Sequence, residues 1–197
     1  MPVAGVDVGS VAAKAVVLDE EKKIVLGRAV LPTGWNSREA GEQVLQAACR
    51  AAGVELAALR RVVGTGYGRV ALPFADKVVT EISCHARGAS WLFPATGVVL
   101  DIGGQDSKVI AVEDGAVQDF VMNDKCAAGT GRFLQVVSGI LGMELPELGQ
   151  AAATGKPVSI SSMCAVFAET EIIGLLAQGT APADIAAGVY LSIARRM

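Results

Sequence analysis

Long apolar runs, aromatic side chains and an excess of one charge are all scarce in this chain of 197 residues. No apolar stretch approaches the length of a membrane-spanning helix, and the first segment, MPVAGVDVGS, carries an acid where a signal peptide has its basic region. The 17 basic and 20 acidic residues give a formal net charge of -3, which provides no field that attracts nucleic acid or anionic lipid. We therefore predict a cytoplasmic protein with neither a nucleic acid nor a membrane as partner.

Two familiar nucleotide-binding motifs are also absent. The sequence contains no G-x-x-x-x-G-K-[ST] segment, so a P-loop is not supported. The glycine-rich stretch Gly64–Arg69 lacks the last glycine of the dinucleotide fingerprint, so a Rossmann site is not supported either. Our preferred interpretation of this stretch is a strand-to-helix turn that needs a positive φ, and closure of a nucleotide domain is the alternative.

Hydrophobic residues make up 52% of the chain, and their spacing predicts an α/β protein. The first part should contain three strands, a helix, another strand and a second helix, at residues 3–8, 12–18, 23–31, 37–53, 61–63 and 84–93. Ser37 is the predicted N-cap of the first helix. The turn at residues 94–97 predicts a boundary between domains 1–94 and 95–197. Beyond it we expect strands at 98–102, 109–112 and 117–122, then helices at 130–141, 145–154, 166–178 and 183–197.

The second part of the chain repeats the beginning of the first at an offset of 94 residues. Asp7 and Asp101 each lie at the end of an apolar strand, and a lysine, Lys14 or Lys108, follows seven residues later. Another strand comes after each lysine, so a duplicated three-strand unit is the simplest explanation. The alternative is coincidence, because a strand followed by Asp-x-Gly is common in α/β proteins.

The turns that follow Asp7 and Asp101 are candidates for phosphate binding. Backbone N–H groups of such glycine-rich turns can face phosphates, and the two aspartates would hold a hydrated Mg²⁺ largely through water. Ser10 and Gln105 add short polar side chains. A lysine after a strand turn is more often a solvated surface charge than a phosphate ligand, and we favour that interpretation for both repeated lysines.

Two of the four cysteines lie where a helix is about to begin. Cys126 stands between a predicted strand and the helix at 130–141, and Cys164 immediately precedes the helix at 166–178. The dipole and unpaired N–H groups of a helix start favour the thiolate, which is the form that binds iron. The alternative is that each cysteine is a small buried hydrophobe, the usual state of a free thiol.

The other two cysteines carry weaker signals. Cys49 lies on an alanine-rich predicted helix, so we interpret it as a packing residue. Cys84 lies beside His85, the only histidine, and no acid–base group stands next to the pair. A structural role is therefore the expectation for His85.

Four segments together resemble one protein family. Asp7-Val-Gly-Ser10 and Asp101-Ile-Gly-Gly-Gln-Asp106 resemble the two phosphate loops of the actin-like ATPase superfamily, which includes sugar kinases, acetate kinase and heat-shock chaperones. Lys125-Cys-Ala-Ala-Gly-Thr-Gly-Arg132 and Ser162-Met-Cys-Ala-Val-Phe-Ala-Glu169 resemble the two cysteine motifs of the activators of 2-hydroxyglutaryl-CoA dehydratase. The ATPase subunits of benzoyl-CoA reductase are similar. The resemblance runs from Val6 to the last predicted helix.

This resemblance implies two ribonuclease-H-like subdomains with a nucleotide cleft between them. The second subdomain is expected to be incomplete at its C-terminus, because family members continue into an adenosine-binding segment. ATP and Mg²⁺ are the implied ligands, with Asp7, Asp101 and Gln105 in catalysis. Contacts to the nucleotide are then expected from Gly9, Ser10, Lys14, Gly103, Gly104 and Gln105.

The resemblance also implies one [4Fe-4S] cluster per homodimer, held by Cys126 and Cys164 of each subunit. A ferredoxin or flavodoxin would reduce the cluster, and ATP hydrolysis would drive one electron into a separate 2-hydroxyacyl-CoA dehydratase or benzoyl-CoA reductase component. Two alternatives stay open. One is a small-molecule kinase of the same fold, with Glu81 and Glu169 as candidate acids, and the other is a non-catalytic assembly or sensor protein.

Overall fold

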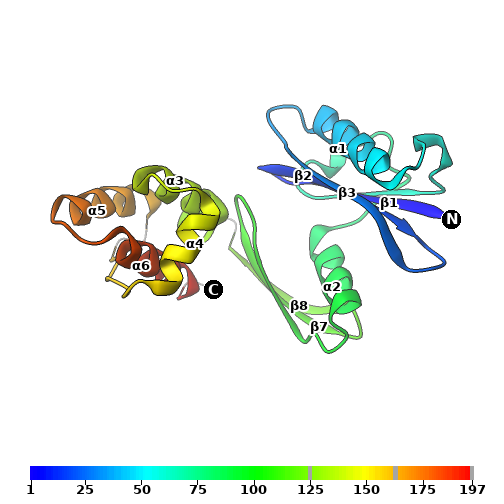
Figure 1. Cartoon of the computed structure of the whole chain (residues 1–197). Coiled ribbons are helices and arrows are strands. Elements are labelled where there is room, and N and C mark those ends of the chain that lie inside the picture. The colour runs from blue at the N-terminus through cyan, green and yellow to red at the C-terminus, as the bar shows by residue number, and fades with distance from the viewer. Residues whose placement is uncertain (124–125, 162–163, 196–197) are drawn as a thin grey trace. The chain divides into compact units, whose positions relative to one another are not determined.

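The computed structural model describes residues 1–123, 126–161 and 164–195 (Figure 1). They form two compact units. Unit 1 comprises Met1–Thr96 and Val112–Val117, and unit 2 comprises Gly97–Ala111 and the described residues from Gln118 onward. In this described part of the chain, no helix has the length and apolar character needed to cross a bilayer.

Unit 1 is built on a five-stranded sheet in the order β3-β2-β1-β4-β5. The antiparallel meander of β1 (Pro2–Val8), β2 (Ala12–Asp19) and β3 (Ile24–Pro32) is confirmed, and β4 (Val62–Thr65) and β5 (Lys77–Val78) extend the sheet in parallel. β4 continues beyond its predicted end at residue 63. β5 cannot be predicted from the sequence, because a strand of two exposed residues is too short to show an alternation of apolar and polar residues.

The helix α1 (Ser37–Ala52) covers one face of this sheet. Its buried apolar residues form one core with the inward side chains of β1 and β2. The Asn36 side chain accepts a hydrogen bond from the Glu39 N–H, so Asn36 is the N-cap and the prediction of Ser37 is wrong by one residue. The helix ends at Gly53, which has a left-handed conformation with φ 63°.

The helix α2 (Glu81–Leu92) lies on the opposite face of the sheet, as Figure 1 shows. It begins earlier than predicted because the Thr80 hydroxyl accepts a hydrogen bond from the Ser83 N–H and caps it. The short 3-10 turns η1 (Leu56–Ala58) and η2 (Arg69–Ala71) flank β4. The sheet therefore has one face closed by α1 and one that α2 covers only in part.

Unit 2 begins with β6 (Val98–Ile102), which pairs antiparallel with β7 (Ser107–Glu113), and β8 (Ala116–Asn123) extends this sheet. The predicted helices follow as α3 (Gly131–Leu141), α4 (Leu145–Thr154), α5 (Ala165–Ala177) and α6 (Pro182–Ala194). Their apolar faces form a second core around Phe133, Leu148, Ile172 and Ile185. The predicted end of the last helix at Met197 lies outside the described residues.

The two units share the register of their first hairpin. In unit 1, Asp7 on β1 lies opposite Lys14 on β2, and in unit 2, Asp101 on β6 lies opposite Lys108 on β7. Both pairs are also ion pairs. The same pairing at the same offset of 94 residues supports a duplication over coincidence.

Candidate functional site

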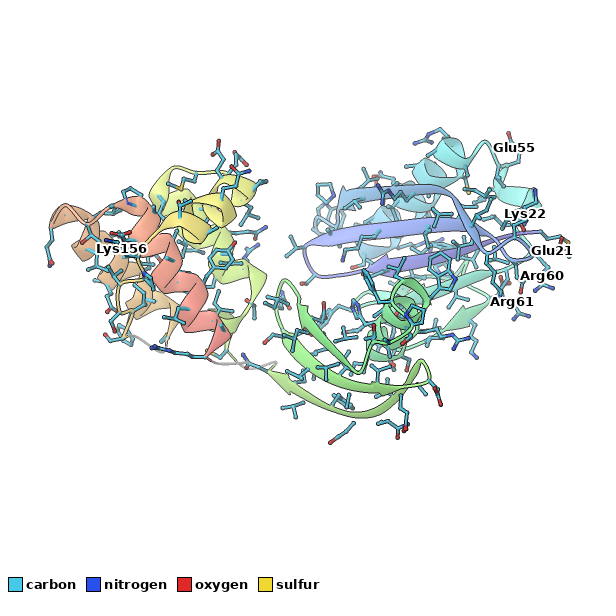
Figure 2. All side chains as sticks on the ribbon, turned by 60° about the horizontal axis from the view of Figure 1, so that its bottom comes forward. Glu21, Lys22, Glu55, Arg60, Arg61 and Lys156 are labelled. Carbon is cyan, nitrogen blue, oxygen red and sulfur yellow. The ribbon has the colours of Figure 1, made fainter. Side chains whose placement is uncertain are left out.

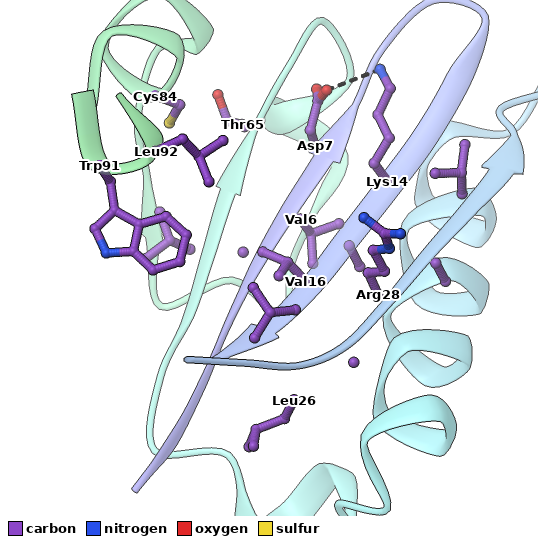
Figure 3. Close-up of a pocket in the computed structure, with 17 residues that line it drawn as sticks. Val6, Asp7, Lys14, Val16, Leu26, Arg28, Thr65, Cys84, Trp91 and Leu92 are labelled. Atoms are coloured by element: carbon purple, nitrogen blue, oxygen red, sulfur yellow. Dashed lines mark hydrogen bonds and ion pairs between the residues drawn. The ribbon is translucent and has the colours of Figure 1, made fainter. Parts of the chain in front are cut away.

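The first candidate loop follows β1 in unit 1. Asp7 lies near the end of β1, and its Oδ2 accepts a hydrogen bond from Lys14 Nζ at 3.0 Å (Figure 3). The Thr33 hydroxyl donates to the Gly9 carbonyl at 2.7 Å and so fixes the turn that contains Ser10. The Lys14 side chain is 46% exposed, as expected for a solvated charge. The structure thus brings Asp7, Gly9, Ser10 and Lys14 together at one end of the sheet.

A group of charged side chains lies at the opposite end of this sheet, around the β2–β3 turn and η1. Figure 2 labels Glu21, Lys22, Glu55, Arg60 and Arg61 there. Arg60 forms an ion pair with Glu20 at 2.6 Å. β1 begins at this end, because Pro2 pairs with Asp19 in the sheet register. These charges are therefore surface groups remote from the loop that follows Asp7.

The glycine-rich stretch after β4 packs on the Asp7 carboxylate. Gly66 has φ 89°, and a side chain at this position would collide with Asp7 Oδ1 and with the Val8 carbonyl. The Gly68 N–H donates to the Val8 carbonyl at 2.8 Å. The predicted turn with a glycine at positive φ is confirmed. Its position against the candidate catalytic aspartate is a feature that the sequence does not predict.

Glu81, one candidate acid of the kinase alternative, is held by this same turn. Its Oε2 lies 3.4 Å from Arg69 Nη1, and Arg69 Nη1 also donates to the Gly66 carbonyl at 3.0 Å. The Glu81 side chain is only 19% exposed. A general base must reach the hydroxyl that it deprotonates, so this pairing argues against Glu81 in that role.

The second candidate loop joins β6 to β7 in unit 2. Lys108 is 2% exposed, and its Nζ lies 3.4 Å from Asp101 Oδ2 and 2.6 Å from Asp106 Oδ1. The prediction of a solvated surface charge is wrong for Lys108, because a second carboxylate completes a buried site for the ammonium. The Gly103 N–H donates to the Asp106 carbonyl at 2.9 Å and closes the loop. Gln105 is exposed within it.

Replacing Lys108 with methionine is expected to lower the free energy of unfolding of unit 2 by about 3–5 kcal/mol, because two partly exposed carboxylates lose the buried ammonium between them. Lys14→Met, at the matching register position, should cost only about 0–1 kcal/mol, because Lys14 is half exposed. Urea unfolding followed by circular dichroism measures both losses. Equal losses would contradict a structural role that is special to Lys108.

The second loop is hydrogen-bonded to the segment that follows Cys126. The Gly131 N–H donates to the Gly103 carbonyl at 2.8 Å, and the Arg132 N–H donates to the Gly104 carbonyl at 3.2 Å. These donors are the first N–H groups of α3, which have no acceptor inside the helix. The backbone of the second candidate loop therefore caps the helix that begins shortly after Cys126.

Cys126 itself is the N-cap of the 3-10 turn η3 (Ala127–Gly129), which precedes α3. Asn123 fixes this position, because its Oδ1 accepts from the Cys126 N–H and its Nδ2 donates to the Cys126 carbonyl, both at 3.2 Å. The cysteine is partly exposed. Lys125, the first residue of the predicted cysteine motif, lies outside the described residues, as does Asp124 before it.

Cys164 is the N-cap of α5 and is exposed. Val166 and Phe167, in the first turn of this helix, are each 68% exposed. The alternative of a small buried hydrophobe is wrong for Cys164 and does not describe the partly exposed Cys126. Ser162 and Met163 lie outside the described residues. Both thiols thus stand at helix starts with access to solvent.

The remaining cysteines belong to unit 1. Cys49 is part of the buried core, and burial raises the pKa of its thiol, with a smaller contribution from the Glu55 carboxylate, so its packing role is confirmed. Cys84 is partly exposed. No three His, Cys, Asp or Glu side chains within the described residues form a group that could hold a metal ion.

A pocket of about 780 Å³ lies in unit 1 on the face of the sheet opposite α1 (Figure 3). Its apolar wall comes from β2, β3 and the end of α2. Asp7, Lys14, Thr65 and Cys84 lie together at its polar end in Figure 3. Asp7 and Lys14, which flank the first candidate loop, therefore line a sizeable hollow of unit 1.

Several proteins similar to this chain are activators of dehydratases. The (R)-2-hydroxyglutaryl-CoA dehydratase activating ATPase of Acidaminococcus fermentans is 44% identical over 195 residues, which cover 98% of this chain and 74% of that protein. The crystal structure of component A of that dehydratase has a TM-score of 0.94 at 42% identity and covers 100% of this chain and 76% of that chain. The activator of the 2-hydroxyisocaproyl-CoA dehydratase from Clostridium difficile, with bound ADPNP, has a TM-score of 0.93 at 40% identity over 100% and 73% of the two chains.

These likenesses confirm the predicted actin-like ATPase fold. A match to the BadF/BadG/BcrA/BcrD ATPase family extends over residues 4–197 and so includes both candidate loops and both cysteine segments. The chain therefore belongs to the BadF/BadG/BcrA/BcrD ATPase family.

Proposed function

We propose that this chain is an ATP-dependent activator that delivers single electrons to a 2-hydroxyacyl-CoA dehydratase or to a reductase of the benzoyl-CoA type. The names of its relatives support the activator role. The observation that carries the proposal is the pair of hydrogen bonds from Gly131 and Arg132 to the Gly103–Gly104 backbone, because they join a phosphate loop to a cysteine segment. A ferredoxin or flavodoxin is the proposed electron donor.

The two phosphate loops have the chemistry that ATP and Mg²⁺ require. Asp7 and Asp101 are both partly exposed, and Mg²⁺ prefers a few carboxylates together with water and phosphate oxygens. Asp7, Asp101 and Gln105 are the proposed catalytic residues, and Gln105 is exposed within the second loop. The proposed contacts to ATP come from the two glycine-rich turns, which let phosphates approach the backbone closely, at Gly9, Ser10, Lys14, Gly103, Gly104 and Gln105.

Cys126 and Cys164 fit a [4Fe-4S] cluster. Cys164 is the exposed N-cap of α5, where the helix dipole favours an anionic sulfur, and Cys126 is the partly exposed N-cap of the turn η3 that leads into α3. Two thiolates per chain are half of those that a cubane cluster needs, so a symmetric homodimer completes the set. Exposed apolar residues close in sequence to the cysteines, Val121, Val166 and Phe167, give the dimer a surface to bury. When bound, the cluster supplies a low-potential one-electron donor.

The loop-to-helix hydrogen bonds offer a route for coupling hydrolysis to electron transfer. A one-electron boost of a few hundred millivolts corresponds to roughly 5–10 kcal/mol, which ATP hydrolysis can supply. When phosphates bind or leave, a shift of Gly103 and Gly104 moves the acceptors of Gly131 and Arg132, and the start of α3 moves with them. Cys126, just before this helix, would change its exposure to a partner protein.

Gly131→Pro is expected to uncouple the two activities. Proline is tolerated at the first position of a helix, and Thr130 before it has φ -125° and ψ 165°, an extended conformation that a following proline favours, so α3 should still form. The substitution removes the N–H that donates to Gly103. We expect ATP hydrolysis within about threefold of wild type and ATP-dependent electron transfer lowered by about tenfold or more.

Gly131→Ala is the matched control, because it keeps this N–H and adds only a methyl carbon about 3.2 Å from the Gly103 carbonyl oxygen. The assay contains reduced ferredoxin, a purified dehydratase or reductase component, and either ATP or a non-hydrolysable analogue. Equal multi-turnover rates of electron transfer with ATP and with the analogue in the wild type would contradict the proposed function. An alanine variant as uncoupled as the proline variant would instead show that bulk, and not the hydrogen bond, is responsible.

The kinase alternative has less support. It needs a catalytic acid that can reach a substrate hydroxyl, and Glu81 is paired with Arg69. Glu169 lies in α5, five residues after Cys164, within the predicted cysteine motif. Neither a kinase nor an assembly protein gives a reason for two accessible thiols at helix starts.

A further inference from the structure

Thr65 carries a buried hydroxyl that no group in the described part of the chain satisfies. It ends β4 with 8% exposure, and no described residue forms a hydrogen bond with its Oγ1. Native proteins rarely leave a buried hydroxyl unpaired, and a bound water or ligand is the usual partner where the protein supplies none. The surroundings of Thr65 indicate what that partner is.

Thr65 lies beside the Asp7 carboxylate. The two residues pair in the parallel register of β4 and β1, so their side chains leave neighbouring strands on the same face of the sheet. Both line the polar end of the unit 1 pocket, where Figure 3 shows the Asp7 carboxylate between Lys14 and Thr65. Lys14 occupies Asp7 Oδ2 at 3.0 Å, and Gly66 lies against Oδ1 without a side chain. The Asp7 carboxylate and the Thr65 side chain therefore lie side by side at the same end of the pocket.

We infer that Thr65 and Asp7 hold one water molecule and that this water is the nucleophile of ATP hydrolysis, an inference that rests on the proposed function. The Thr65 hydroxyl donates its hydrogen to one lone pair of the water, which satisfies the buried group. Asp7 Oδ1 accepts a hydrogen bond from the water. These two contacts leave the second lone pair of the water directed at the phosphate.

The proposed step is a displacement at the γ-phosphorus of ATP. The water oxygen forms a bond to the γ-phosphorus while the bond from that phosphorus to the bridging oxygen breaks, and the electron pair of the broken bond leaves with ADP. One water proton is released to solvent and the other stays on the phosphate product, while the Asp7 carboxylate orients the water through its hydrogen bond. Thr65 is unchanged, so it is a positioning residue.

Two substitutions separate the hydroxyl of Thr65 from its shape. Thr65→Val replaces the hydroxyl by a methyl group, and we expect kcat for ATP hydrolysis to fall by about 100-fold while affinity for a non-hydrolysable ATP analogue stays within about threefold. Thr65→Ser keeps the hydroxyl and should retain kcat within about threefold of wild type. The Tm of Thr65→Val should not fall, because the valine variant loses no hydrogen bond to the described protein groups.

A wild-type rate in Thr65→Val would overturn the inference and leave the proposed function intact. The inference also fails if affinity for the analogue falls as much as kcat, because Thr65 is then a nucleotide ligand. If the serine variant is as slow as the valine variant, the loss of rate comes from packing, and the inference fails. If Thr65→Val does not fold, Thr65→Ala replaces it with the same expected results. Absence of ATP hydrolysis by the wild-type chain would overturn the proposed function and the inference together.

Discussion

Serine in place of Cys126 or Cys164 is expected to remove the iron from the protein and to abolish electron transfer. Purified without oxygen, the wild-type chain should be a brown dimer with about four irons per dimer. Each substitution takes two of the four thiolates from a symmetric cluster, because both subunits carry the change. Iron and sulfide content, the electron paramagnetic resonance spectrum of the reduced protein and the mass in solution measure the loss.

Cys84→Ala and Cys49→Ala are the controls, and both should keep the full iron content. Cys84 is partly exposed, as Cys126 is, but lies in unit 1, and Cys49 is buried in the core of that unit. A colourless wild-type chain, or a Cys126→Ser variant with wild-type iron, would exclude the proposed cluster. Phosphorylation of a sugar by such a colourless chain would favour the kinase alternative.

The elements that follow directly from periodicity are the ones that the sequence predicts well. β6 (Val98–Ile102) and α4 (Leu145–Thr154) have the predicted bounds, because apolar runs and turn residues delimit them on both sides. Helix starts are displaced where a polar cap precedes the apolar pattern, as Asn36 and Thr80 do. The division of the ATPase fold into residues 1–94 and 95–197 stays a prediction.

The contacts that build the candidate site are less accessible from sequence, because they join distant segments. No pattern in the sequence around Lys108 indicates that this lysine is buried. It is enclosed in the structure because Asp101 and Asp106 both approach its ammonium. The bonds from Gly131 and Arg132 to the second loop cross 28 residues of chain, and a cluster of glycines at both ends is their only local sign. The roles of Asp7, Asp101, Gln105, Cys126 and Cys164 stay proposals.

Gly66→Ala is expected to lower the free energy of unfolding of unit 1 and to abolish most ATP hydrolysis. Alanine at φ 89° costs about 1–2 kcal/mol. The new methyl group would collide with Asp7 Oδ1 and the Val8 carbonyl, which adds about 1–3 kcal/mol of overpacking. Displacing the carboxylate by about 1 Å should slow hydrolysis by about 100-fold. Urea unfolding and steady-state hydrolysis measure the two effects.

Gly34→Ala separates the contact from the backbone strain. Gly34 also has a positive φ, 60°, but no atom lies within 4 Å of the position that its methyl group would take. This variant should therefore show only the strain of about 1–2 kcal/mol and hydrolyse ATP at the wild-type rate. The extra loss in Gly66→Ala then reports the contact with Asp7. If both variants lost the same stability and kept wild-type hydrolysis, the turn after β4 would not be what positions the Asp7 carboxylate.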